Sequence, residues 1–184
     1  QRCLQKWQER GITCHLIIGN RDVLAGVQLK KLTGLRLHWG PLLLKCETAH
    51  LLLMHGDELL PQDVSYQRFR RIMRHSLTKA IIQVLPLALI RKCAGVTREH
   101  SQQKTKNMSL THFSPLLDGL KHWLTHYPEI RDMMVGHFHT PKKFQLSVDQ
   151  RTMNIEILEQ SHSTCLTVAQ WQQGKISQEK FHQT

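Results

Sequence analysis

Leu51-Leu52-Leu53-Met54-His55-Gly56-Asp57 is an apolar run that ends in a polar turn. The pattern appears twice more: residues 14–18 lead into Gly19-Asn20-Arg21-Asp22, and residues 133–135 lead into Gly136-His137-Phe138-His139. Short apolar runs that end in turn residues are typical of buried strands. Because strand ends fix the backbone while the loops beyond them can aim side chains at a ligand, the three turns predict one site on an α/β fold.

The candidate ligands in these turns are Asn20, His55, His137 and His139. Imidazole nitrogens and amide or carboxylate oxygens suit Mn, Fe or Zn better than Ca or Mg. Taken alone, an asparagine after glycine is more often a turn former, and a lone histidine more often packs or faces solvent. Three strand-end turns in one chain favour a metal site.

Charge is the second informative property of this 184-residue chain. Lysine and arginine number 25 against 14 aspartates and glutamates, a formal net charge of +11 with 13 histidines counted as neutral. Such an excess favours anionic partners such as phosphorylated substrates, acidic lipid headgroups or nucleic acid. A solvated basic surface without a specific ligand is the alternative.

The length suits a single domain, and 40% apolar residues are enough for a core. The five cysteines are odd in number and form no Cys-x-x-Cys pair, which argues against a disulfide framework or a structural zinc finger. The sequence shows no signal peptide and no run of 18 apolar residues. We therefore expect a cytoplasmic protein without a membrane span.

Hydrophobic periodicity and turn residues predict the order of the elements. We expect helices at 2–10, 24–32 (closed by Gly34), 63–94 and 116–126, and strands at 12–18, 42–46, 51–54 and 130–135, followed by closing strands between residues 144 and 181.

Residues 77–90 form an apolar helical stretch that is too short to cross a bilayer. An apolar helix with basic flanks is typical of a segment at a lipid surface or beside an acyl chain. An ordinary core helix is the alternative reading. The basic flanking residues are Arg68, Arg70, Arg71, Arg74 and Lys79 before and within the stretch, and Arg91, Lys92 and Arg98 after it.

The order and the residues of the three turns resemble those of the calcineurin-like metallophosphoesterases. Within that superfamily most members have a histidine where this chain has Arg21. Arginine there, followed by His-Gly-Asp and a long helical insertion, looks like the UDP-2,3-diacylglucosamine hydrolases of lipid A synthesis. Residues 57–63, 66–70, 85–87 and 91–92 also follow that family pattern. The resemblance implies one α/β domain over residues 1–184, an N-terminally incomplete αββα sandwich with an inserted helical lid at 63–113.

The resemblance also implies roles for individual residues. Asn20, His55, His137 and His139 would be ligands in a centre that holds two Mn²⁺ ions in the intact family. Arg21 would be the catalytic residue that clamps a phosphate oxygen. Thr105 stands where the family has asparagine, and Met108 where it has lysine. The implied substrate-binding residues are Asn20, Arg21, Asp63, Ser101, Thr105, Met108 and His137.

The implied reaction is hydrolysis of the pyrophosphate of UDP-2,3-diacylglucosamine, in which water attacks the α-phosphate and releases UMP and lipid X. The implied partners are this lipid substrate and the cytoplasmic face of the inner membrane, with peripheral attachment. We expect a monomer and no specific nucleic-acid partner.

Two turns of the family pattern are missing. The family has an Asp-x-His and a Gly-Asp upstream of the asparagine turn, and the 18 residues before Gly19 contain neither. We therefore expect the C-terminal two-thirds of a domain, with at most an incomplete metal centre and no activity of its own. Two alternatives stay open: a metallophosphoesterase acting on another phosphodiester, and a non-catalytic remnant that binds anionic membrane or nucleic acid.

Overall fold

The N-terminal segment forms a small parallel strand pair flanked by two helices. The computed structural model describes residues 2–19, 27–46, 49–60, 64–85, 113–138, 141–148, 150–159, 161, 165–172 and 174–182. Helix α1 (Arg2–Glu9) and strand β1 (His15–Ile17) precede helix α2 (Val27–Thr33) and strand β2 (Arg36–His38), and β1 pairs with β2 in parallel. Gly34 adopts φ 68° directly after α2, as expected of a residue that ends a helix.

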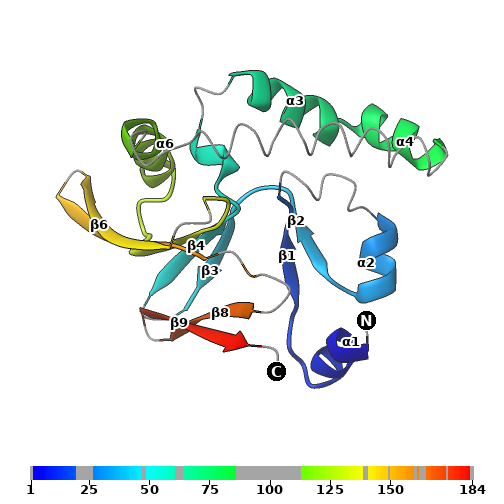
Figure 1. The fold of residues 1–184 in the computed structure, drawn as a ribbon, viewed down its shortest axis with the longest axis horizontal. Coiled ribbons are helices and arrows are strands. Elements are labelled where there is room, and N and C mark those ends of the chain that lie inside the picture. Colours follow the sequence, from blue (N-terminus) through cyan, green and yellow to red (C-terminus); the bar gives the residue numbers. More distant parts are fainter. Residues whose placement is uncertain are drawn as a thin grey trace.

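A mixed five-stranded sheet forms the centre of the molecule (Figure 1). Its strand order is β3 (Leu42–Lys45), β4 (His50–Met54), β5 (Asp132–Val135), β7 (Arg151–Ile157) and β6 (Lys142–Val148). The three central strands β4, β5 and β7 run parallel, and the outer strands β3 and β6 pair antiparallel to their neighbours. The predicted α/β class is therefore confirmed.

Helix α6 (Phe113–His126) covers one face of this sheet. Leu116, Leu120 and Leu124 recur every four residues, which places them on one side of the helix, and all three are buried. They join a core that consists mostly of side chains from β4, β5 and β7. The other buried members of this cluster are Leu52, Met54, Leu59, Ile130, Met133, Val135, Met153, Ile155 and Ile157.

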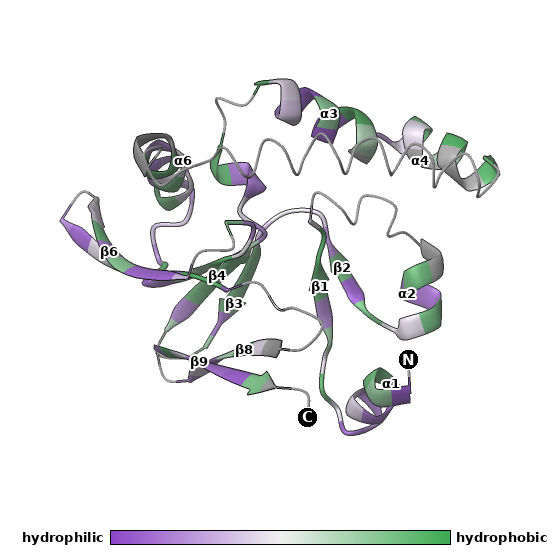
Figure 2. Cartoon of the chain, viewed as in Figure 1, coloured by the Kyte–Doolittle hydropathy of each residue, from purple (hydrophilic) through white to green (hydrophobic). Residues whose placement is uncertain are grey.

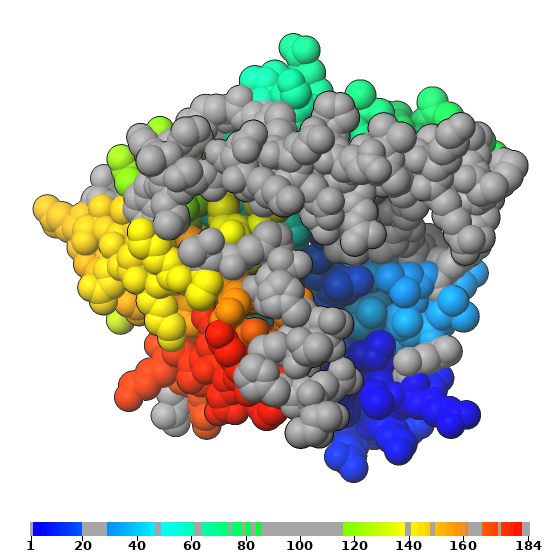
Figure 3. Space-filling view, in the orientation of Figure 1, coloured from blue at the N-terminus to red at the C-terminus, as the bar shows by residue number. Residues whose placement is uncertain are grey.

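Two helices of the predicted insertion lie beyond the end of β4. A 3-10 turn, η1 (Asp57–Leu59), follows β4 after His55 and Gly56, and α3 (Val64–Arg74) and α4 (Ser76–Val84) follow η1. In Figure 3 the α3–α4 segment (green) lies along the opposite edge of the molecule from the C-terminal strands (red). The rest of the expected lid, residues 86–112, lies outside the described residues.

The C-terminal hairpin of β8 (Cys165–Gln172) and β9 (Lys175–His182) is tied to the central sheet by two buried carboxylates. The indole Nε1 of Trp171 donates to Oδ2 of Asp132 at 3.0 Å, and Gln178 donates to Glu156. Both acids lie on parallel central strands, and a buried charge is tolerated there because each accepts hydrogen bonds. The hairpin therefore docks through specific polar contacts.

Candidate metal centre

The sheet brings His55 and His137 together. Met54 and Val135 are paired neighbours on parallel strands β4 and β5. Parallel strands have their carboxyl ends at the same edge, so the residues that follow them meet there. His55 follows β4 directly, and His137 lies two residues beyond β5. The centroids of their rings are 5.1 Å apart, in an edge-on arrangement.

Glycines allow the two turns to approach this closely. Gly56 adopts φ 108°, and a Cβ added there would lie 2.8 Å from the carbonyl oxygen of Gly136 and 2.8 Å from Cγ1 of Val135. The N–H of Gly136 donates to the carbonyl oxygen of Met54 at 3.3 Å. A side chain at Gly56 would therefore be strained by its φ and by the opposite turn.

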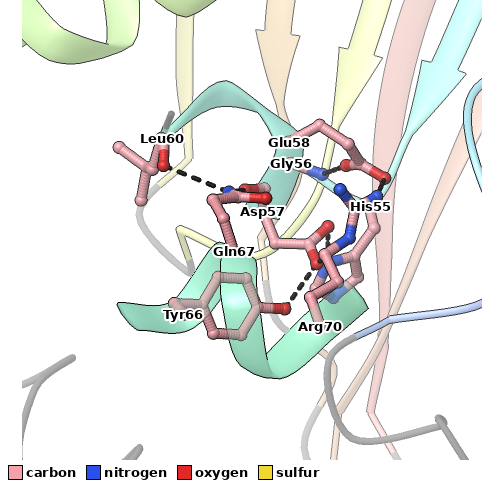
Figure 4. A network of polar contacts seen from close by, with 8 residues as sticks. All are labelled: His55, Gly56, Asp57, Glu58, Leu60, Tyr66, Gln67 and Arg70. Carbon is pink, nitrogen blue, oxygen red and sulfur yellow. Dashed lines mark hydrogen bonds and ion pairs between the residues drawn. The ribbon is translucent and has the colours of Figure 1, made fainter. Parts of the chain in front are cut away.

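Asp57 lies behind His55 at the centre of a polar network (Figure 4). Its Oδ1 is 3.1 Å from Nδ1 of His55. Its Oδ2 accepts a hydrogen bond from the hydroxyl of Tyr66 at 2.5 Å and lies 3.2 Å from Nε of Arg70. The Asp57 side chain has no exposed surface. The sequence therefore buries a carboxylate beside the first histidine and places one hydrogen-bond donor and one cationic side chain of α3 against it.

Glu58 and Gln67 extend this network to the backbone of η1. Glu58 accepts a hydrogen bond from the N–H of Gly56 at 3.2 Å, and its other oxygen is 2.5 Å from Nη2 of Arg70. The amide of Gln67 donates to the carbonyl oxygens of Asp57 at 3.0 Å and of Leu60 at 3.1 Å. The turn after His55 is therefore bound to α3 through both side chains and main chain.

The two adjacent carboxyl groups differ in their preference for a proton. Burial disfavours the charge of Asp57, but hydrogen bonds with His55, Glu58 and Tyr66 and the charge of Arg70 outweigh it, so the pKa of Asp57 falls well below its usual range. Burial, the hydrogen bond with Asp57 and the charge of Asp57 raise the pKa of Glu58. Asp57 is therefore the ionised member of the pair, and its carboxylate can accept a hydrogen bond from Nδ1 of His55.

Asp57 and Glu58 are expected to change the stability of the fold with pH in opposite directions. A lowered folded-state pKa means that Asp57 contributes stability above its ordinary value of about 3.9, which is lost as pH falls toward the folded-state value. Glu58, with a raised pKa, contributes stability below about 4.3 that is lost as pH rises through its folded-state value. In Asp57→Asn the free energy of unfolding should fall less as the pH is lowered below about 3.9. In Glu58→Gln it should fall less as the pH is raised above about 4.3. Urea denaturation at a series of pH values checks this, and parallel curves for the wild type and both variants would contradict it.

A cavity of about 270 Å³ lies beside His137. Gly136 and His137 line one part of it, and Ser161 and Thr167 line another. The Thr167 hydroxyl is buried and has no hydrogen-bond partner within the described structure. The cavity therefore offers room next to one of the two histidines.

The other predicted site residues cannot be placed. Asn20, Arg21, Asp63, Ser101, Thr105, Met108 and His139 lie outside the described residues. Within the described parts of the chain, no group of three or more histidine, cysteine, aspartate or glutamate residues is placed to hold a metal ion. The described part of the candidate centre therefore supplies two imidazoles.

Asp57, Glu58, Tyr66, Gln67 and Arg70 are not among the site residues predicted from the sequence. A signal was present in the spacing of Tyr66 and Arg70, because residues four apart on a helix lie on one face. The pattern alone does not reveal that this face meets the turn after His55, and the arginine was instead grouped with the basic flank of the insertion.

These features define an α/β protein with two histidines at the carboxyl edge of its central sheet. No family model matches the chain. The chain is a homologue of proteins named UDP-2,3-diacylglucosamine hydrolase, which confirms the resemblance drawn from its turns.

The similarity extends over most of the chain. The protein of that name from Stutzerimonas stutzeri is 32% identical over 148 residues, which are 80% of this chain and 61% of the relative. The one from Pectobacterium carotovorum is 32% identical over 142 residues, 77% of this chain and 59% of the relative. The one from Pseudomonas savastanoi is 30% identical over 155 residues, 84% and 62% of the two chains. The chain therefore spans about three-fifths of the length of the curated relatives it matches.

Proposed function

We propose that this chain carries part of the catalytic centre of a hydrolase that cleaves the pyrophosphate of UDP-2,3-diacylglucosamine. The observation that supports this most directly is the similarity of about four-fifths of the chain to proteins with that name. The meeting of His55 and His137 at the carboxyl edge of the sheet agrees with it, because that edge is where α/β sheets bind ligands.

The imidazole and amide donors fit a metal ion that is intermediate between hard and soft. An imidazole whose Nδ1–H is held by a carboxylate carries its lone pair on Nε2, the usual arrangement of a metal-bound histidine. His55 and His137 would hold the metal, for which we propose Mn²⁺, together with Asn20 and His139. When bound, two such ions would supply charge neutralisation at the phosphate and a more acidic water.

In the proposed reaction an oxygen of water forms a bond to the α-phosphorus of the substrate, and the bond from that phosphorus to the bridging oxygen breaks. The bridging oxygen leaves with the phosphate of lipid X, UMP is the other product, and the two protons of the water pass to the product phosphates or to solvent. Arg21 would neutralise charge on the phosphate oxygens through its planar guanidinium. We further propose that Asp63, Ser101, Thr105, Met108 and His137 contact the substrate, and that the cavity beside His137 gives it room.

The test uses the product of the complete coding region with UDP-2,3-diacylglucosamine and Mn²⁺. Phosphorus NMR should show UMP and lipid X appearing together, and a chelator should stop both. Hydrolysis of a simple phosphodiester without hydrolysis of the lipid would favour a different substrate. No hydrolysis of either, with vesicle binding that falls steeply with salt and ignores Mn²⁺, would favour a binding remnant.

We also propose that α3 and α4 rest on the anionic inner leaflet of a cytoplasmic membrane, as part of a monomeric peripheral protein. Among the described helices none is both long and apolar enough to span a bilayer. Ile72, Leu77 and Ile81 are 61%, 63% and 49% exposed, and Figure 2 shows the hydrophobic bands on α4. Exposed Arg68 and Arg71 on α3 add positive charge that acidic headgroups attract.

The variant Leu77→Asp with Ile81→Asp is expected to bind phosphatidylglycerol vesicles about tenfold or more weakly than the wild type, because each side chain loses apolar contact with lipid. Vesicle co-sedimentation measures this. Leu32→Asp is the matched control, since Leu32 is 61% exposed but lies on α2. Equal loss of binding in the control would contradict a role specific to α3 and α4.

A further inference from the structure

We propose that helix α3 sets the tautomer and orientation of His55 through Asp57, so that docking of α3 and the ability of His55 to bind a metal are coupled. Asp57, Tyr66 and Arg70 are then positioning residues. The inference rests on the proposed function only in taking His55 as a metal ligand. The positioning itself is a property of the metal-free chain.

The two ring nitrogens of His55 have different roles. In a neutral imidazole one nitrogen carries hydrogen and the other carries the lone pair, and the partner of one decides the state of the other. Nδ1 of His55 faces Oδ1 of Asp57 at 3.1 Å. A carboxylate only accepts hydrogen bonds, so it requires the hydrogen on Nδ1. The lone pair is then on Nε2, which can bind a metal.

Asp57 is itself held in place by side chains of α3. Tyr66 and Arg70 lie four residues apart, on one face of this helix, and both reach Oδ2 of Asp57. Arg70 also pairs with Glu58 at 2.5 Å, and Glu58 accepts the N–H of Gly56. Figure 4 shows these side chains pointing toward one another between α3 and the turn. Oδ1 is thereby left to His55, and the carboxylate is fixed in one orientation.

Helix α3 is attached to the turn after His55 on one side and exposed on the other. Its opposite side is open, because Val64, Arg68, Arg71 and Ile72 are all exposed. Gln67 binds the carbonyl oxygens of Asp57 and Leu60, so it too attaches the helix to the turn after His55. A displacement of α3, for example by a ligand on its exposed side, would therefore move the residues that hold Asp57. His55 would then lose the fixed carboxylate that faces its Nδ1.

Nitrogen-15 NMR of the histidine side chains in the metal-free chain tests the proposal. The His55 resonances, assigned by their loss in His55→Gln, should show hydrogen on Nδ1 and a lone pair on Nε2. Asp57→Asn should shift His55 toward the opposite tautomer, because an amide can donate to Nδ1. Arg70→Gln and Tyr66→Phe should give mixtures of the two forms. Arg71→Gln removes the same charge from the exposed side of α3 and should leave the wild-type pattern.

Titration with Mn²⁺ alone provides the second readout. We expect Asp57→Asn and Arg70→Gln to weaken Mn²⁺ binding about 10- to 100-fold relative to Arg71→Gln. Hydrogen on Nε2 in the wild type, or an unchanged His55 pattern in Arg70→Gln and Tyr66→Phe, would overturn the proposal even if the protein hydrolyses the lipid. Conversely, the expected NMR pattern with no hydrolysis would leave the positioning intact and reject the proposed function.

Discussion

Replacing His55 or His137 with alanine is expected to lower Mn²⁺-dependent hydrolysis of UDP-2,3-diacylglucosamine by more than about 100-fold, because loss of a ligand should exceed the 10- to 100-fold effect of losing a group that supports a ligand. The measurement is kcat/KM from UMP release by the product of the complete coding region. The two rings lie 5.1 Å apart at one edge of the sheet, so each variant should impair the same centre.

His122→Ala is the matched control for these variants. His122 is exposed on α6, and its ring contacts Trp123 and His126 on the same helix. We expect its activity to equal that of the wild type. Circular dichroism should show that all three proteins are folded. If His55→Ala and His137→Ala retain wild-type kcat/KM, the two histidines are not part of the reaction centre.

Gly119→Ala is expected to lower the free energy of unfolding by about 3 kcal/mol, the upper end of the usual range for overpacking. A Cβ added at Gly119 would lie 2.1 Å from the carbonyl oxygen of Leu59 and 2.7 Å from its carbonyl carbon, so α6 and η1 would have to separate. Helix propensity alone would favour alanine by about 1 kcal/mol, so the predicted sign depends on tertiary packing.

Urea denaturation measures the free energy of unfolding of Gly119→Ala, with Gly40→Ala as the control. A Cβ at Gly40 would meet no atom within 4 Å, so that variant should stay within about 0.5 kcal/mol of the wild type. Because η1 begins two residues after His55, Gly119→Ala should also broaden the His55 resonances. A Gly119→Ala protein that is more stable than the wild type would show that α6 does not approach η1 so closely.

Three strands of the five-stranded sheet were well predicted from sequence. Expected strands at 42–46, 51–54 and 130–135 correspond to β3 (Leu42–Lys45), β4 (His50–Met54) and β5 (Asp132–Val135). Most side chains of each strand are at least partly buried, so each strand is rich in apolar residues. Such an apolar run can be recognised in the sequence without knowing which strand it pairs with. Strand β2 (Arg36–His38) was missed, because three residues with two polar side chains show no periodicity.

The candidate centre was predicted only in part. His55 and His137 follow apolar runs directly, so their turns were recognisable, and the parallel pairing of β4 and β5 brings them together. Asp57, the acid that orients His55, belongs to a stretch that follows the family pattern, but its residue type alone predicts no role for it. Its meaning depends on Tyr66 and Arg70, which reach it only because α3 docks on this turn.

Patterns within the chain were enough to predict the α/β class, the strands that end in polar turns, the basic charge and the likeness to the diacylglucosamine hydrolases. These are properties of short windows, where apolar spacing and turn residues reflect the local backbone. The contacts between distant residues became known from the folded chain, for example Asp132 with Trp171, Leu59 with Gly119, and Asp57 with Arg70. Such pairs depend on sheet register and helix docking, which arise from the burial of the whole core and leave no periodic trace in the chain.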